Sequence, residues 1–255
     1  MNGNSVELAA EFTIFSRLIR ALQNAVLSQA LQIMEPFRIP DPLRNLRGAH
    51  PEAEAVLAAA RSGGNSSCVA LARLWLTEGI PYAFAECPAV FEVLRGWLAT
   101  RLDVDPKEIS LTGSARIGSS ISPGKQGIKF SPSSDLDLFV VSESLFGKLR
   151  DEFNQWTYEF DGGIVKAANS REHAFWKDNA ARGIGLLARG FIDQKMIPNL
   201  SNYPTVKSIS QGMWLLTEKL RLTDGAPTPT HASIRCYRSW NHAIQQISLN
   251  LGSIA

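Results

Sequence analysis

Residues 135–141 carry the strongest strand signal in this chain, and helical patterns surround it on both sides. The segment reads Asp-Leu-Asp-Leu-Phe-Val-Val, an apolar run rich in β-forming residues. Apolar stripes with alternating spacings of three and four run along residues 8–33, 88–102 and 206–220, and this spacing predicts helices. Short strands set among many helices are typical of an α+β fold. We therefore expect a small sheet flanked by helices, with additional helices towards the N- and C-terminal ends.

Turn residues and periodicity predict the remaining elements. An apolar run at 109–112 ends at Gly113 and predicts a second strand, and further short strands are expected at 191–197 and 232–237. The SGGNSS cluster at 62–67 should interrupt a helical stretch, and Ser142 is placed to cap a helix. The other expected helices cover residues 52–61, 68–78, 142–156, 172–188 and 239–251.

The order of these elements predicts three parts. They are an N-terminal helical region that packs on the core (1–87), the core itself (88–194), and a mostly helical C-terminal part with one short strand (195–255). No internal repeat is visible in the chain.

The composition is that of an ordinary globular protein. Of 255 residues, 45% are hydrophobic and 20% are charged, which excludes a disordered chain and a small disulfide scaffold. No apolar run approaches the roughly 18 residues of a membrane span, and the first residues lack the basic start of a signal peptide. Three widely spaced cysteines favour a reducing compartment. We therefore expect a cytoplasmic protein without a membrane partner.

The charge is nearly balanced, with a formal net charge of +2. A net charge this small does not by itself indicate a nucleic-acid-binding protein. Residues 195–255 hold six Lys or Arg against two acids. This bias leaves two interpretations open, a surface that faces a polyanion and an ordinary solvated surface.

Asp135 and Asp137 stand two residues apart at the start of the 135–141 segment. In a strand, residues at this spacing project from the same face, while Leu136 and Leu138 point to the other. Two adjacent carboxylates repel one another, and a bound cation relieves the repulsion. Oxygen ligands of this kind suit Mg²⁺, which retains several waters and bridges to substrate phosphates. Such a pair is also typical of exposed strand ends, so the metal site depends on the segment that precedes it.

That segment, residues 111–119, reads Leu-Thr-Gly-Ser-Ala-Arg-Ile-Gly-Ser. Gly113 ends the predicted strand and allows a backbone turn to approach a phosphate closely. Free N–H groups and the Ser114 hydroxyl can donate to phosphate oxygens, and Arg116 can add positive charge. A phosphate-binding turn followed by a metal-binding strand makes up the two halves of a site for a nucleoside triphosphate with Mg²⁺.

These two motifs, in this order, resemble those of the polymerase-beta-like nucleotidyltransferase superfamily. Asp135 and Asp137 match its acid pair. The pattern G-S-x-x-x-G-[S/T] looks most like the branch that contains oligoadenylate synthases and bacterial cyclic-nucleotide synthases, and it matches here at Gly113, Ser114, Gly118 and Ser119. The resemblance covers about residues 88–156. It implies a small mixed sheet of the nucleotidyltransferase type within a core at 88–194.

The resemblance also implies an enzyme that moves a nucleoside monophosphate from a nucleoside triphosphate to a hydroxyl acceptor and releases pyrophosphate. Asp135 and Asp137 would hold Mg²⁺, or Mn²⁺ in its place. The nucleotide would lie in a cleft between the sheet and the helices of residues 195–255. The acceptor stays open between a nucleotide, an RNA end, a small molecule and a protein. The implied nucleotide-binding residues are Gly113, Ser114, Arg116, Ser119 and Lys125.

The chain departs from the family pattern in two places. The spacing of 22 residues from Gly113 to Asp135 exceeds the usual connection. The surplus loop, which carries Lys125 and Lys129, has two interpretations, a flap over the triphosphate and a plain surface loop. The family's third carboxylate, which activates the acceptor hydroxyl, is best matched by Asp193, because the strand expected at 232–237 contains no acid.

Two other hypotheses remain beside the enzyme. A catalytically inert nucleotidyltransferase-like chain would bind a nucleotide or serve as a partner subunit, and the unclear third acid supports it. A helical interaction protein with an accidental motif would have no strand at 109–112. Near the C-terminus, Cys236 is expected in the core, and Tyr237 and Trp240 are interpreted as packing residues rather than as base-stacking ones.

Overall fold

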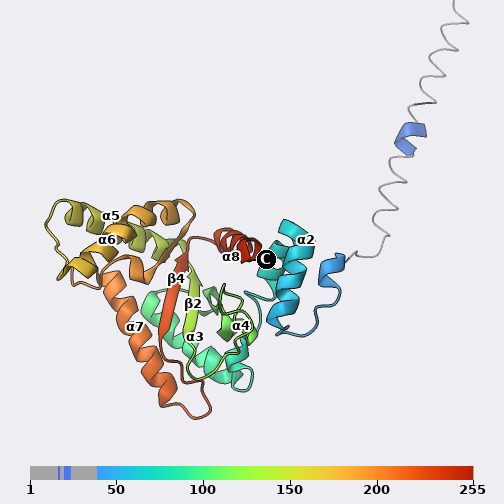
Figure 1. Cartoon of the computed structure of the whole chain (residues 1–255), viewed down its shortest axis with the longest axis horizontal. Helices are drawn as coiled ribbons and strands as arrows, with labels where there is room; N and C mark the ends of the chain where they lie inside the picture. The colour runs from blue at the N-terminus through green and yellow to red at the C-terminus, as the bar shows by residue number, and fades with distance from the viewer. Residues whose placement is uncertain (1–16, 18–19, 24–38, 255) are drawn as a thin grey trace, which may run out of the picture. The chain divides into compact units, whose positions relative to one another are not determined.

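The computed structural model describes residue 17, residues 20–23 and residues 39–254 (Figure 1). The chain divides into two compact units, residues 1–39 and residues 40–255, and the fold below is that of the second unit. The helix expected along residues 8–33 lies outside the described residues, except for Arg17 and residues 20–23, which are helical.

A four-stranded mixed sheet lies at the centre of the described fold. Its strands are β1 (Ile109–Leu111), β2 (Leu136–Val141), β3 (Phe191–Asp193) and β4 (Ala232–Tyr237), in the order β1-β2-β4-β3. The central strands β2 and β4 are parallel, and each outer strand runs antiparallel to its neighbour. The expected α+β class with a small mixed sheet is thus confirmed. The strand at 109–111 is also evidence against the helical interaction protein.

Helices cover both faces of the sheet, and strand alternation decides which side chains each face presents (Figure 1). One face contributes Leu136, Leu138, Val140, Ile234 and Cys236 to the main hydrophobic core. This core also includes buried side chains of α3 (Pro88–Leu102), α5 (Glu143–Asp161), α6 (Ser170–Ala188) and α7 (Pro204–Arg221). The opposite face carries Phe139, Val141, Phe191 and Tyr237, which cluster with Ala243 of α8 (Trp240–Ile254).

Local signals in the sequence place most helix ends. Pro88 begins α3, and the Ser142 hydroxyl accepts a hydrogen bond from the Leu145 N–H at 3.3 Å, which confirms the expected cap of α5. The helical stretch α2 (Ala53–Leu74) is interrupted at Gly64, where φ is 59° and ψ is −153°, so the break expected at 62–67 is confirmed.

One expected strand is shorter in the structure. The sequence predicted a strand over 191–197, but β3 ends at Asp193 and residues Gln194–Met196 form a 3₁₀ turn. Asn179, on α6, donates a hydrogen bond to the Lys195 carbonyl at 3.0 Å, so this backbone pairs with a helix instead of continuing the ladder.

The region before the sheet packs on the last helix. Residues of α2 and α8 form a second hydrophobic cluster, to which Leu71, Ile247 and Leu251 belong. Residues 40–87 therefore share one compact unit with the rest of the described fold. Within the described part of the chain, no helix combines the length and the hydropathy that a bilayer crossing requires.

Tyr203, at the start of α7, makes the free energy of unfolding depend on pH in the alkaline range. Its side chain is fully buried, and its hydroxyl donates to Glu159 Oε2 at 2.7 Å. Burial, together with the bond to the Glu159 carboxylate, raises the pKa of this phenol. Because the folded-state pKa exceeds the unfolded value of about 10, the contribution is fully present below pH about 10 and is lost as the pH rises above it.

We therefore expect the free energy of unfolding to fall more steeply between pH 9 and pH 11 in the native chain than in Tyr203→Phe. Urea unfolding followed by circular dichroism at both pH values measures the two slopes. Equal slopes would show that Tyr203 does not titrate differently in the folded and unfolded states.

Candidate functional site

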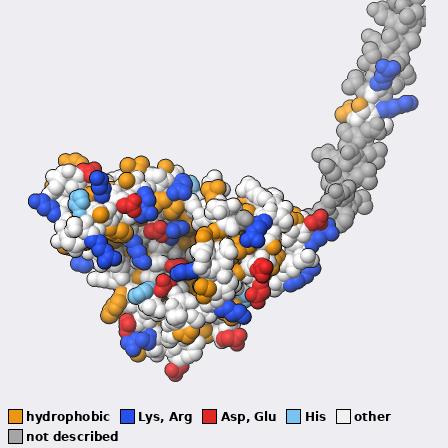
Figure 2. Space-filling model, in the orientation of Figure 1, with side chains coloured by type: hydrophobic (Ala, Val, Ile, Leu, Met, Phe, Trp, Pro, Cys, Tyr) orange, Lys and Arg blue, Asp and Glu red, His pale blue; other side chains and the backbone are white. Residues whose placement is uncertain are grey.

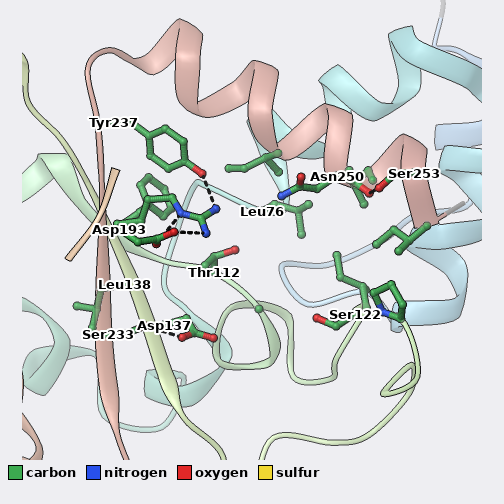
Figure 3. Close-up of a pocket in the computed structure, with 18 residues that line it drawn as sticks. Leu76, Thr112, Ser122, Asp137, Leu138, Asp193, Ser233, Tyr237, Asn250 and Ser253 are labelled. Atoms are coloured by element: carbon green, nitrogen blue, oxygen red, sulfur yellow. Dashed lines mark hydrogen bonds and ion pairs between the residues drawn. The ribbon is translucent and has the colours of Figure 1, made fainter. Parts of the chain in front are cut away.

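A cavity of about 450 Å³ lies between the sheet face that bears Phe139 and helix α8 (Figure 3). Strands β2, β4 and β3 form its floor, α8 forms one wall, and the turn at Gly113 and the loop at 121–123 form its rim. In Figure 2 the surface of the described unit is hollowed, and acidic and basic side chains gather in the hollow. The charged residues that line the cavity within the described chain are Asp137, Asp193 and Arg235.

One oxygen of the Asp137 carboxylate accepts a hydrogen bond, and the other faces the Gly113 turn. Asp137 lies opposite Ser233 in the parallel β2–β4 register, and the Ser233 hydroxyl donates to its Oδ1 at 2.8 Å. The other oxygen, Oδ2, faces Gly113, where an added Cβ would stand 3.6 Å away. Gly113 adopts φ 67° and ψ −151°, a conformation that glycine reaches without steric cost. The backbone conformation of this turn therefore favours glycine, and the 3.6 Å distance brings the turn into contact with the carboxylate.

Asp135 lies just outside the cavity. It is exposed and directly precedes β2, whereas Asp137 is within the strand and lines the cavity. The alternation expected from the sequence is present, because Leu136 and Leu138 are buried on the opposite face. The two acids thus flank the end of β2 that is nearest to the Gly113 turn.

The oxygen donors around Asp137 fit a hard divalent cation. Asp137 Oδ2 is not the oxygen that Ser233 orients, and the glycine beside it leaves room for a ligand. Carboxylate oxygens with a hydrogen-bonded outer partner are typical of Mg²⁺ sites, which take one or two carboxylates plus substrate phosphates and water. Among the described residues, no group of three His, Cys, Asp or Glu side chains is arranged for a metal ion. A cation here would therefore be completed by oxygens of a ligand and of water.

Asp193 reaches the cavity but is already paired. It lies opposite Arg235 in the β3–β4 register, and the guanidinium donates to both of its oxygens, from Nε at 2.9 Å and from Nη2 at 3.0 Å. Burial alone would lower the pKa of Arg235, but the hydrogen bonds and charge of Asp193 raise it above its ordinary value. With both oxygens occupied, Asp193 is placed as the counter-ion of Arg235 rather than as a free third carboxylate.

The Arg116 side chain is bound elsewhere and does not line the cavity. It belongs to the short helix α4 (Ser114–Ile117) and is only 1% exposed. Its guanidinium donates to the carbonyl oxygens of Trp75 and Gly79, both at 3.0 Å, and burial lowers its pKa to about 10. The expectation that Arg116 binds the nucleotide is corrected accordingly, because the side chain fastens α4 to the chain that follows α2.

The other expected phosphate ligands lie around the rim or away from it. Ser114 is half-buried at the start of α4, next to Gly113, and does not line the cavity. Ser119 is buried, pairs through its backbone with Lys129, and does not line the cavity. Lys125 is exposed outside the cavity lining. Of the five residues expected to bind the nucleotide, Gly113 alone lines the cavity.

The long loop before β2 has features of both interpretations, a flap over the site and a plain surface loop. Its arms pair through the Ser119–Lys129 bridge and through bonds from Ser120 N to Ile128 O and from Gly127 N to Ser120 O. One arm, residues 121–123, lines the cavity. The lysines, in contrast, lie on the exposed part of the loop.

Several cavity residues were not expected from the sequence. Strand β4 was predicted, but its polar positions were not predicted to line a site. These positions, Ser233, Arg235 and Tyr237, alternate with the buried Ile234 and Cys236, and this alternation was the available signal. No local pattern indicates the remaining polar residues of the lining, which are Thr112, Ser122, Asn250 and Ser253.

The aromatic and thiol side chains of this region behave as packing residues. Tyr237 is 3% exposed and meets Phe139 edge to face, with ring centroids 5.8 Å apart. Trp240 packs on the same Phe139 ring at 5.9 Å. Cys236 is buried, and burial raises the pKa of its thiol, so its expected place in the core is confirmed.

Comparison of the chain with protein-family models, with curated proteins and with solved structures found no match. The function proposed next therefore rests on the residues of this cavity and on the resemblance of the two motifs.

Proposed function

We propose that this protein is a nucleotidyltransferase, which transfers a nucleoside monophosphate from a nucleoside triphosphate to a hydroxyl acceptor and releases pyrophosphate. The observation that carries the proposal is the position of Asp137. Its carboxylate lies in a cavity, oriented by Ser233 on one oxygen and open towards the Gly113 turn on the other. A glycine turn and an oriented carboxylate thus adjoin one another, and the proposal assigns the phosphates to the turn and their cation to the carboxylate.

Asp135 and Asp137 would hold Mg²⁺ in this proposal. When bound, the ion supplies charge neutralisation for the phosphates and for the oxygens that attack and leave. Ser233 keeps Asp137 in one orientation, and the Gly113 backbone allows the phosphates to approach without a side chain in the way. The hydroxyls of Thr112, which lines the cavity, and of Ser114, on the other side of Gly113, could donate to a phosphate oxygen.

The cavity offers little positive charge for the phosphates. Arg235 is the cation among its described lining residues, and Asp193 neutralises it through two hydrogen bonds. Binding of a triphosphate is therefore expected to depend strongly on the divalent cation, because the side chains alone leave its charge uncompensated.

A second candidate is the catalytically inert nucleotide-binding subunit. The specific observation in its favour is that Asp193 is bound on both oxygens by Arg235, which makes it the counter-ion of Arg235 rather than a free base for an acceptor hydroxyl. Both candidates predict a nucleotide in the cavity, and only the first predicts turnover.

The test is pyrophosphate release from each of the four ribonucleoside triphosphates, with Mg²⁺ and with a chelator, together with mass spectrometry of the products. We expect release with Mg²⁺, none with the chelator, and none from the Asp135→Asn/Asp137→Asn variant. The product masses identify the donor and the acceptor.

Calorimetric titration of the same triphosphates separates the other outcomes. Cation-dependent binding without release in the presence of candidate acceptors would support the inert protein. No binding to any of the four would overturn both candidates.

A further inference from the structure

The wall of the cavity formed by α8 presents an amide in a fixed orientation. Asn250 points its side chain into the cavity from the last turns of the helix (Figure 3). Its Oδ1 accepts a hydrogen bond from Gln246 Nε2 at 2.8 Å, one helical turn earlier. Because the acceptor of the amide is engaged, the group that Asn250 offers to a ligand is the Nδ2 donor.

A buried residue holds this orientation. Gln246 is 7% exposed, and its own Oε1 accepts from Arg189 Nη1 at 3.5 Å. The chain of bonds runs from Arg189 through Gln246 to Asn250, and each amide in it has its carbonyl oxygen occupied. Reversal of the Asn250 amide would break its bond to Gln246, so these hydrogen bonds keep the Nδ2 donor of Asn250 available to a ligand.

An acceptor lies beside this donor. Ser253 lies in the same part of the cavity lining. Its hydroxyl donates a hydrogen bond to the backbone carbonyl oxygen of Asn250, one helical turn earlier, at 2.8 Å. Its oxygen lone pairs therefore remain for a ligand. Asn250 and Ser253 together present one donor and one acceptor next to each other.

The surroundings of this pair are uncharged. Leu76, Ile121 and Leu251 supply apolar contacts, and the nearest charges in the lining are the mutually neutralised Asp193 and Arg235. A phosphate or an ammonium group would find no partner of opposite charge here. A flat, uncharged group with an acceptor and a donor on one edge would satisfy both polar residues and cover the apolar ones.

We infer that the α8 end of the cavity binds a nucleobase, and that Asn250 determines its selection by donating a hydrogen bond to a ring nitrogen or carbonyl oxygen of the base. The inference rests on the proposed function, since that function places the phosphates at Asp137, at the other end of the cavity. A site built to donate one hydrogen bond rejects a base that offers no acceptor, because the base then covers the Asn250 donor and leaves it unpaired.

The test compares Asn250→Asp with Asn241→Asp, the same substitution at an exposed position of α8 that does not line the cavity. The carboxylate has no donor, so Asn250→Asp should weaken binding of the preferred ribonucleoside by roughly 10- to 100-fold. Asn241→Asp should leave it unchanged. Ligand-observed NMR measures the four ribonucleosides without phosphate, and calorimetry measures the four triphosphates with Mg²⁺.

Gln246→Leu tests the orientation of the Asn250 amide at a residue that does not line the cavity. It frees the Asn250 amide to reverse, and we expect it to reduce discrimination among the four bases. A thermal melt confirms that each variant is folded before its binding is compared.

Two outcomes separate the inference from the proposed function. If triphosphates bind with Mg²⁺ and both Asn250→Asp and Gln246→Leu leave the base preference unchanged, the inference is wrong and the proposed function stands. If Asp135→Asn/Asp137→Asn abolishes triphosphate binding but retains nucleoside binding that Asn250→Asp weakens, both are supported. Absence of nucleoside and triphosphate binding in the native chain would overturn both.

Discussion

Replacement of Glu152 by alanine is expected to lower the free energy of unfolding by about 3–5 kcal/mol, from the loss of two hydrogen bonds to a charged group. Glu152 lies on α5 and is 8% exposed. Its Oε1 accepts from the Thr205 N–H at 2.7 Å, and its Oε2 accepts from the Val206 N–H at 3.0 Å. These are N–H groups of the first turn of α7, which have no partner within that helix. Alanine would leave them unpaired beside a cavity.

Asp151→Ala is the matched control for this prediction. Asp151 is the preceding residue on α5, is exposed, and pairs with its neighbour Arg150. Its loss should change stability by no more than about 0.5 kcal/mol. Urea unfolding followed by circular dichroism gives both values. Equal stability of the two variants would mean that Glu152 does not contribute to the junction of α5 with α7.

Asp137→Asn is expected to reduce pyrophosphate release by about 1,000-fold or more, which corresponds to about 4 kcal/mol of activation free energy. Asparagine keeps the shape of the side chain and can still accept the hydrogen bond of Ser233, so the fold should not change. What it removes is the negative charge of the oxygen that faces Gly113. Asp161→Asn, at the exposed end of α5, is the control and should retain activity within about twofold.

Cation binding gives a readout that does not require turnover. Titration of Mn²⁺, followed by the loss of the free-ion paramagnetic resonance signal, should show weaker binding in Asp137→Asn than in Asp161→Asn. Ser233→Ala should weaken it by about 10- to 100-fold, as expected when a residue that orients a metal ligand is lost. Undiminished Mn²⁺ affinity in Asp137→Asn would remove this carboxylate from the cation site.

The sequence predicted those parts of the site that depend on local pattern. Alternation along β2 places Asp137 on the cavity face and Leu138 in the core, and a glycine at the end of β1 indicates a turn. These features involve residues within a few positions of one another. They follow from strand geometry whatever the rest of the chain does.

Long-range partners are what the sequence did not reveal. Arg116 was expected to bind a phosphate because arginine is suited to that role, but in the structure its guanidinium donates to the carbonyl oxygens of Trp75 and Gly79. Asp193 was selected as an acid on a short strand, and its partner Arg235 lies 42 residues later. For both side chains, contacts with residues far away in the sequence determine what they bind, and a local pattern does not reveal those contacts.

Helix α8 belongs to two hydrophobic clusters at once. Ala243 packs with Phe139 on the sheet, whereas Ile247 and Leu251 pack with α2 and also line the cavity. The wall that faces the sheet is thus braced from behind by residues that precede both motifs in the chain. The width of the cavity consequently depends on how α8 packs on α2. A change of side-chain volume on the buried face of α2 would shift α8 and alter this width, although Asp137 and Gly113 would be unchanged.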